Sequence, residues 1–215
     1  MKSIALIGFK GNLGKLIVNK MNFIQFKFDL DNIEDFFCLT KCDTVIHLGE
    51  HSSPDISLEK STDNINSTIK ILNHSEKIGV KHFIYASSHR RYGSWENHIK
   101  INEPIKPLIP ITFYGAAKGY IEDVLKLKSL ESAMHYSLLR IGTILIDEYE
   151  DEELELLNNE WAGKYKYTRV KGGVFLDFLT KILLSETNQK FLVYNILPKK
   201  SILNKIFDGK NFHNY

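Results

Sequence analysis

Near its start the chain reads Ile4-Ala5-Leu6-Ile7 and then Gly8-Phe9-Lys10-Gly11-Asn12-Leu13-Gly14. The first run has the pattern of a short buried strand, and residues 13–21 have the pattern of an amphipathic helix. Glycines at this spacing between a strand and a helix let the backbone approach a pyrophosphate, whose charge suits the helix N-terminus. The stretch therefore predicts a dinucleotide-binding turn, with a plain tight turn as the alternative.

Strand and helix patterns alternate along the rest of the chain, which predicts an α/β, Rossmann-like, doubly wound parallel sheet. The expected strands are residues 23–28, 44–49, 82–86, 136–141 and 191–196, and the expected helices are 58–78, 113–130, 154–158 and 174–184. We expect a polar loop at residues 50–57, and a short helix with a frayed end at 201–215. Residues 1–146 would form the dinucleotide-binding core and 147–215 a small substrate-binding part packed on it, as a single domain overall.

Tyr114 and Lys118 stand four residues apart at the start of the expected helix 113–130. Residues at this spacing share one helix face, so the ammonium can stabilise a phenolate beside it. A phenol then becomes a usable base near neutral pH. Ser87 and Ser88 follow the expected strand at 82–86, which would bring them to the same edge of the sheet. An ordinary surface pair is the alternative for the tyrosine and the lysine taken alone.

Asp29 and Leu30 follow the expected strand at 23–28. An acid near this place can hold the adenosine ribose, which favours NAD over NADP. The alternative for Asp29 is a helix cap before residues 33–39.

Composition narrows the function classes. A chain of 215 residues that is 43% hydrophobic can bury one sizeable core. Its net charge of +2 is spread along the chain, which gives no case for a nucleic-acid or membrane surface. We find no transmembrane or signal-peptide pattern and expect a cytoplasmic protein. Cys38 and Cys42 are expected to be reduced thiols, and the spacing of the eight histidines suggests no metal.

Over about residues 1 to 195 the chain resembles the extended short-chain dehydrogenase/reductases, also called the NAD-dependent epimerase/dehydratase family. Within that family its motifs look most like those of the uronate dehydrogenases. The motifs that match the family as a whole are, in order, Gly8-x-x-Gly11-x-x-Gly14, Val45-Ile46-His47-Leu48, Asp63-Asn64-Ile65, Tyr85-Ala86-Ser87-Ser88-x-x-x-Tyr92-Gly93, Tyr114-x-x-x-Lys118 and Leu139-Arg140-Ile141-Gly142. The likeness to the uronate dehydrogenases rests on Tyr85-Ala86-Ser87-Ser88, Phe113-Tyr114-Gly115 and Leu139-Arg140-Ile141-Gly142-Thr143.

The resemblance implies hydride transfer, with NAD as cofactor and NADP as the alternative, on a secondary hydroxyl or carbonyl of a sugar, sugar acid or nucleotide sugar. Ser88 would hydrogen-bond the substrate and Tyr114 would be the general acid/base. Lys118 would hold the nicotinamide ribose and lower the pKa of Tyr114, and Asn64 would support a proton-relay water. The implied cofactor-binding residues are Gly8, Lys10, Gly11, Asn12, Leu13, Gly14, Asp29, Leu30, Leu48, Gly49, Tyr114, Lys118 and Ile141. The implied substrate-binding residues are Ser88, His89, Arg90 and Tyr114.

The chain also departs from the family pattern. The unit after the first helix is so short that Asp29-Leu30 can match a later Asp-Leu of the family, with the second strand deleted. This shortening and the small C-terminal part motivate a second hypothesis, a non-catalytic dinucleotide-binding sensor or partner protein. Where the uronate dehydrogenases carry Asn-His after the serine, this chain has His89-Arg90. Arg90 or Arg91 could bind a carboxylate, or the two could be an exposed pair.

Family members often form a homodimer through a four-helix interface. In this chain the helices at 58–78 and 113–130 would form it. Ile69, Ile121 and Leu125 are apolar enough to serve there, or they face the chain's own sheet.

Overall fold

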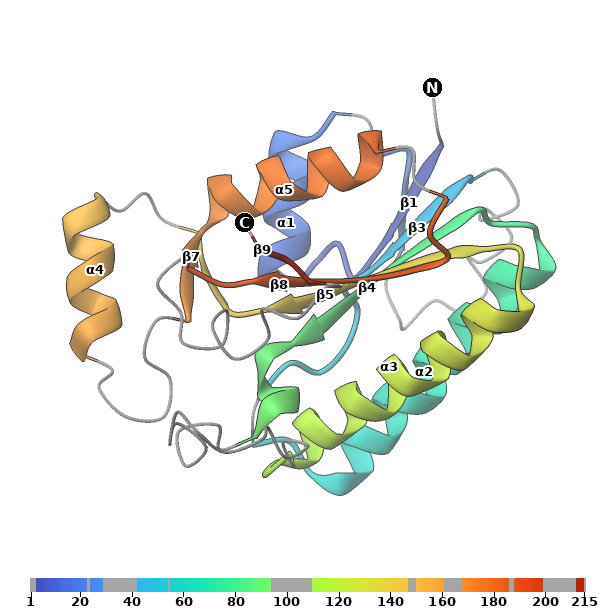
Figure 1. The fold of residues 1–215 in the computed structure, drawn as a ribbon, viewed down its shortest axis with the longest axis horizontal. Helices are drawn as coiled ribbons and strands as arrows, with labels where there is room; N and C mark the ends of the chain where they lie inside the picture. The colour runs from blue at the N-terminus through green and yellow to red at the C-terminus, as the bar shows by residue number, and fades with distance from the viewer. Residues whose placement is uncertain are drawn as a thin grey trace.

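The computed structural model describes residues 3–22, 24–28, 42–53, 55–93, 110–146, 150–160, 168–185, 188–198 and 212–214. Within these residues one sheet has seven strands, all parallel, in the order β2-β1-β3-β4-β5-β8-β9 (Figure 1). The strands are β1 (Ile4–Ile7), β2 (Phe26–Phe28), β3 (Thr44–His47), β4 (His82–Ser88), β5 (His135–Ile141), β8 (Phe191–Ile196) and β9 (Phe212–Asn214). The predicted α/β, Rossmann-like sheet is confirmed.

Helices cover both faces of this sheet. In Figure 1, α1 and α5 lie on one face, α2 and α3 lie on the other, and α4 stands apart at one end. A second, two-stranded sheet pairs β6 with β7. These elements are α1 (Asn12–Lys20), α2 (Leu58–Lys77), the 3-10 turn η2 (His89–Tyr92), α3 (Phe113–Glu131), β6 (Thr143–Leu145), α4 (Asp151–Glu160), β7 (Arg169–Lys171) and α5 (Gly172–Leu184).

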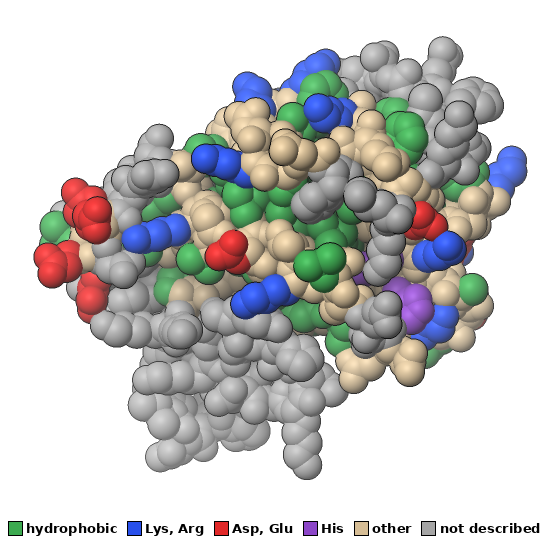
Figure 2. All heavy atoms as spheres, turned by 90° about the horizontal axis from the view of Figure 1, so that it is seen from above, with side chains coloured by type: hydrophobic (Ala, Val, Ile, Leu, Met, Phe, Trp, Pro, Cys, Tyr) green, Lys and Arg blue, Asp and Glu red, His purple; other side chains and the backbone are tan. Residues whose placement is uncertain are grey.

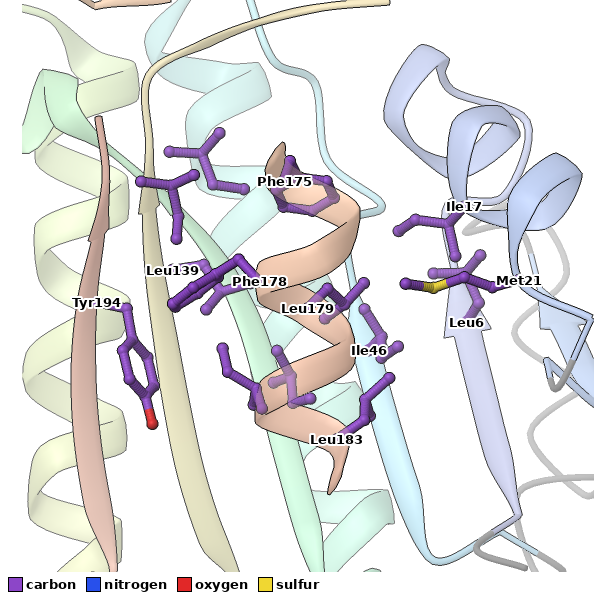
Figure 3. Packing of buried hydrophobic residues seen from close by; sticks show 14 of the residues in the cluster. Leu6, Ile17, Met21, Ile46, Leu139, Phe175, Phe178, Leu179, Leu183 and Tyr194 are labelled. Carbon is purple, nitrogen blue, oxygen red and sulfur yellow. The ribbon is translucent and has the colours of Figure 1, made fainter. Parts of the chain in front are cut away.

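Two apolar cores form on the two faces, because successive residues of a strand point to opposite sides. In β1, Ile4 and Leu6 belong to the core under α1 and α5, whereas Ala5 and Ile7 belong to the core under α2 and α3. Each buried Phe or Leu contributes roughly 1.5–3 kcal/mol, so α5 is an integral part of the domain. Figure 3 shows Phe175, Phe178, Leu179 and Leu183 of α5 packed with Leu6, Ile17, Met21, Ile46, Leu139 and Tyr194.

The second strand is retained. β2 pairs in parallel with β1, and the backbone N–H of Gly8 donates to the carbonyl of Phe28 over 2.8 Å. The end of β2 therefore lies against the glycine turn. Asp29 and Leu30, which come next, lie outside the described residues, as does all of the chain up to residue 41.

Several elements differ from the prediction: β2 is shorter than the strand expected at 23–28, and η2, β6 and β7 are not among the expected elements. β4 runs on to Ser88, so both serines are strand residues at its carboxyl end. The helix expected at 154–158 is longer and begins at Asp151. The tail, expected as a helix and a frayed end, contains β9, which pairs with β8. Pairing with an open sheet edge gives this backbone hydrogen-bond partners that its local sequence does not reveal.

The helices α2 and α3 bear on the expected homodimer. Ile121 and Leu125 are 2% and 0% exposed and pack against the chain's own sheet, as does part of Ile69. They therefore take the second of the two roles expected for them. The exposed apolar side chains on α3 are Phe113, Tyr120, Leu127 and Leu130, and the homodimer stays a prediction.

Surface charge is scattered over the face shown in Figure 2, except that acidic side chains gather at α4. Glu152, Glu153 and Glu155 of this helix are exposed, as expected of a solvated acidic segment. None of the helices in the described part of the chain combines the length and the apolar character needed to cross a membrane.

Candidate functional site

A cleft of about 430 Å³ opens where the parallel strands end. The strand register sets Ile7 beside His47 and Ser88 beside Ile141, so the carboxyl ends of β1, β3, β4 and β5 meet there. Ligands of open α/β sheets bind at this edge, in clefts of roughly this size. The lining residues are Gly8, Gly11, Asn12, Leu13, Gly14, Leu48, Glu50, Ser52, Ala86, Ser87, Ser88, His89, Arg90, Tyr114, Lys118, Ile141, Gly142, Thr143, Ile144 and Ile146.

The glycine turn forms one wall of the cleft. Gly8 has a φ of +88°, and a Cβ on it would come within 2.5 Å of Gly49 Cα. A Cβ on Gly14 would overlap the carbonyl oxygen of Gly8. Gly11 differs, because among the described residues a Cβ there would meet only the Gly8 oxygen, at 3.5 Å. The chain's own packing requires the first and third glycines, whereas the second leaves its surroundings open to a ligand.

The same wall carries the start of α1. Gly11 is the N-cap and has no side chain with which to cap this helix end. The first N–H groups of a helix have no partner inside the helix, and the helix dipole makes this end attractive to anions. An open glycine followed by an uncapped helix start fits the pyrophosphate of a dinucleotide.

Ser88 and Tyr114 face the cleft from β4 and α3. Ser88 is 6% exposed, and its hydroxyl oxygen accepts the N–H of Arg90 over 3.2 Å. The start of α3 lies close to η2 because residue 115 is glycine: a Cβ there would come within 2.5 Å of the Arg90 carbonyl oxygen. The side chain of Thr112 caps α3 by accepting the N–H of Gly115. Local sequence thus brings the tyrosine to the serine's side of the cleft.

Lys118 is buried beneath these groups. Its ammonium nitrogen lies 5.5 Å from the centre of the Tyr114 ring and 4.6 Å from that of Tyr85. It donates to the carbonyl oxygen of Ala86 and to Glu50 Oε2, and both distances are 2.5 Å. Burial disfavours its charge, but the neighbouring Glu50, Tyr114 and Glu122, with Glu50 first among them, together outweigh burial and raise the pKa of Lys118.

Glu50 is the carboxylate that Lys118 meets. Its Oε1 accepts hydrogen bonds of 2.9 Å from the hydroxyls of Thr68 and Tyr85. Burial opposes its ionisation, yet Lys118, His47 and the Thr68 hydroxyl together leave the pKa of Glu50 below its ordinary value. Both members of the pair are therefore charged at neutral pH.

His47 ends this buried chain of polar groups. Its Nε2 lies 2.9 Å from the oxygen of Thr68, whose hydroxyl donates to Glu50. Burial lowers the pKa of His47 to about 4, so the imidazole is neutral and we assign its proton to Nε2. Its Nδ1 is buried and meets no hydrogen-bond partner within the described residues.

A second buried network lies behind the cleft and centres on Glu122 of α3. Its carboxylate accepts Nε and one terminal N–H of Arg140, at 2.6–3.1 Å, and pairs with Arg91 Nε at 2.9 Å. A further N–H of Arg140 donates to the hydroxyl of Tyr92 over 2.6 Å. The hydroxyl of Tyr92 in turn donates to Asn195 of β8. The network joins α3, η2 and two strands, and it fixes Arg91 away from the cleft.

The neighbouring residues of η2 behave differently. Arg90 lines the cleft, while Arg91 is held by Glu122. His89 also lines the cleft, with Nδ1 lying 3.1 Å from the carbonyl oxygen of Ile141. Burial lowers the pKa of His89 to about 4. Of the two arginines considered from the sequence, only Arg90 is positioned to meet a ligand.

Most of the predicted site residues line the cleft together. Lys10, Gly49 and Asn64 are not among the lining residues. The Asn64 amide instead clamps the loop after β3, accepting the N–H of His51 over 2.9 Å and donating to its carbonyl over 3.0 Å. The roles assigned to all of these residues stay predictions. Those that line the cleft are Gly8, Gly11, Asn12, Leu13, Gly14, Leu48, Ser88, His89, Arg90, Tyr114, Lys118 and Ile141.

Glu50 is the main site residue that sequence reasoning missed. It was expected in a polar loop, since nothing in the local pattern links it to Lys118. A usable signal was its position just after a strand that ends at the cleft edge, where polar side chains meet ligands. Ser87 lines the cleft at the sheet edge expected for it, although no site role is predicted for it. The other lining residues not predicted are Ser52, Ala86, Gly142, Thr143, Ile144 and Ile146.

Comparison with protein families gives one match. A family model described as "NAD dependent epimerase/dehydratase family" matches residues 10–146. No curated protein sequence matches the chain significantly.

Solved structures with the same fold share little sequence with the chain. A mutated uronate dehydrogenase is 17% identical with a TM-score of 0.72, covering 100% of this chain and 78% of that one. MoeE5, solved in complex with UDP-glucose and NAD, is 15% identical with a TM-score of 0.70, covering 96% and 80%. UDP-N-acetylglucosamine 4-epimerase from Bacillus cereus is 16% identical with a TM-score of 0.69, covering 100% and 88%.

Proposed function

The chain belongs to the NAD-dependent epimerase/dehydratase family, and on this premise we propose that it is an NAD(P)-dependent oxidoreductase. Its reaction would be hydride transfer at a secondary hydroxyl or carbonyl of a sugar, sugar acid or nucleotide sugar. The observation that carries the proposal is the shared cleft: Ser88, Tyr114 and Lys118 line it opposite the glycine turn. NAD is the expected cofactor, since NAD appears in the family description and in a neighbouring structure.

The residues present fit this cofactor. The open side of Gly11 and the N–H groups of residues 12–14 would hold its pyrophosphate, while Leu48 and Ile141 would flank it in the cleft. Lys118 would hold the nicotinamide ribose. When bound, the nicotinamide supplies or accepts the hydride.

The chain's own groups would handle the proton. The Ser88 oxygen already accepts the N–H of Arg90, which leaves its hydroxyl proton for a substrate oxygen. Tyr114 as the phenolate would take the proton of that oxygen in oxidation, and as the phenol it would return the proton in reduction. Ala86 and Glu50 fix the ammonium group of Lys118 in place beside the phenol. Asn64 would support this arrangement by holding the His51 loop.

Arg90 supports a sugar acid as the substrate. It lies in the cleft near Ser88, whereas Arg91 is occupied by Glu122. A guanidinium can hold a carboxylate through two parallel hydrogen bonds. We therefore place sugar acids first among the substrate classes, with His89 as a further contact.

We also propose that two regions of the chain have different roles. Residues 1–146 would bind the cofactor, and 147–215 would support the substrate side. The contact of α5 and β8 with the main core favours a single domain overall.

One observation favours the alternative of a non-catalytic dinucleotide-binding protein. Glu50 already engages the ammonium of Lys118, which reduces what the lysine can offer a ligand. Removing the Tyr114 hydroxyl distinguishes the two functions. An enzyme should lose turnover, whereas a sensor should be unaffected because it does not need that hydroxyl.

The testing experiment is a fluorescence titration of the purified protein with NADH and NADPH, followed by a turnover screen of sugar acids, neutral sugars and nucleotide sugars. Binding of NADH together with turnover of a sugar-type substrate supports the enzyme. Binding without turnover on any of these classes supports the sensor. Binding of neither nucleotide overturns both.

A further inference from the structure

The carboxylate of Glu50 is a buried charge to which the proposed chemistry assigns only the holding of Lys118. The Glu50 and Lys118 side chains are 4% and 5% exposed, and both residues line the cleft. Placing a full negative charge beside the lysine cancels the field that the lysine would exert on a bound molecule.

We infer that Glu50 is a positioning residue that cancels the charge of Lys118 at the reacting end of the cleft, and so favours the oxidised cofactor over the reduced one. This inference rests on the proposed function. It concerns the balance between two states of one ligand and is separate from the question of whether the ligand binds.

Geometry fixes the pair in place. An ammonium has three N–H donors, and Glu50 Oε2 and the Ala86 carbonyl take two of those of Lys118. The third N–H meets no acceptor among the described residues and is left for a ligand. Glu50 is anchored in turn by Thr68 of α2 and Tyr85 of β4. The carboxylate is therefore held on the lysine from two further elements.

The charge states follow from the same contacts. Lys118 has a raised pKa and Glu50 a lowered one, each because the other offsets the cost of burial. The pair then has no net charge at neutral pH. The oxidised nicotinamide ring carries a positive charge and the reduced ring is neutral, so a lone ammonium would disfavour the oxidised form. With Glu50 present, that penalty is removed.

The consequence is a preferred direction. A site that binds NAD⁺ tightly relative to NADH makes it easier for NADH to donate a hydride to the substrate. It makes it harder for NAD⁺ to accept a hydride from the substrate. Compared with the same cleft bearing Lys118 alone, this one should favour carbonyl reduction over alcohol oxidation.

Stability alone is a weak reason for a buried ion pair such as Glu50–Lys118. Replacing a buried ion pair by apolar groups of similar volume is often neutral or stabilising, whereas removing one partner is costly. An effect on the bound cofactor explains why a buried ion pair lies at this position, whereas packing alone does not.

The test compares the ratio of the NAD⁺ and NADH dissociation constants in four proteins at pH 7. They are the wild type, Glu50→Gln, the double variant Glu50→Gln with Lys118→Met, and Glu59→Gln. Glu59 is an exposed glutamate at the start of α2, so its variant is a matched control. We expect Glu50→Gln to raise the ratio roughly tenfold, the effect of one unit charge across a partly buried site. The double variant and the control should keep the wild-type ratio.

A ratio within twofold of wild type in folded Glu50→Gln overturns the inference, as does a double variant that keeps the raised ratio. Should Glu50→Gln not fold, Lys118→Met is compared with the double variant at pH 8, where the remaining carboxylate should lower the ratio in the single variant. Equal ratios there also overturn it. Failure of the wild type to bind either nucleotide overturns the proposed function itself, which makes the two failures distinguishable.

Discussion

The hydroxyl of Ser87 donates to the carboxylate of Glu122 across 2.5 Å, which ties the end of β4 to the middle of α3. Because Ser88 is the next residue and Tyr114 is on the same helix as Glu122, this bond links the two elements that carry the proposed chemistry. The same carboxylate holds Arg140 and Arg91. Glu122 is thus the internal support of the cleft.

Replacing Glu122 by glutamine should lower the free energy of unfolding by about 3–5 kcal/mol, because the buried guanidinium of Arg140 loses its counterion. Chemical denaturation at pH 7 measures this. Asp123→Asn is the matched control: that carboxylate is 70% exposed and 3.8 Å from Arg91, so its loss should cost under about 1 kcal/mol. Equal losses in the two variants would show that the network carries no special stability.

Tyr114→Phe should reduce turnover by about 10²–10⁴-fold, since the variant keeps the ring and loses the proton donor. Its dissociation constant for NADH should change little. Tyr120→Phe, on the exposed side of the same helix, should leave turnover at the wild-type level. Steady-state kinetics and NADH fluorescence measure both effects. If Tyr114→Phe turns over normally, the assigned acid/base is wrong.

Gly11→Val should abolish dinucleotide binding while leaving the fold intact, because only the Gly8 oxygen approaches a Cβ at that position. Gly14→Ala should instead lower the unfolding free energy, since its methyl group would overlap the backbone of Gly8 and Phe9. Fluorescence titration and denaturation separate the two outcomes. Normal NADH affinity in Gly11→Val would remove the glycine turn from the binding site.

Stability should fall as the pH drops from 6.5 towards 4. Burial holds the pKa values of His47 and His89 at about 4 in the folded protein, below the ordinary 6.5. Between these pH values the unfolded chain binds more protons, so acid favours unfolding by up to about 1.4 kcal/mol per pH unit for each histidine. His47→Gln should flatten this slope, as followed by urea denaturation between pH 4.5 and 7.5. A variant with the wild-type slope would contradict the assignment.

Arg90→Gln should raise the KM for a sugar acid at least tenfold and leave the KM for a neutral sugar unchanged, because only the acid has a carboxylate to lose a partner. The comparison variant is Arg91→Gln, which should act on stability through Glu122. Kinetics with a matched pair of acid and neutral sugars measure the effect. A parallel rise for both sugars would point to a distorted cleft and against a carboxylate contact.

The sequence predicted the parts of the fold and of the cleft that depend on residues close together in the chain. The glycine turn, the serines at the end of β4 and the Tyr114–Lys118 pair are short-range patterns, and the cleft gathers them because parallel strands end together. The sequence did not predict the role of Glu50, because its partners Thr68, Tyr85 and Lys118 lie on three other elements that are distant in the chain. β9 escaped because its pairing with β8 depends on an edge that exists only in the folded sheet.

The two edge strands of the main sheet also affect how readily molecules of the protein aggregate during refolding. Within the described residues, the edge strands β2 and β9 are three residues long. An open edge is a template for strand addition from another molecule, and a short one gives such growth little to start from. The longest strands, β4 and β5, are enclosed in the middle of the order. The arrangement should therefore protect concentrated protein against edge-to-edge aggregation once β4 and β5 have paired.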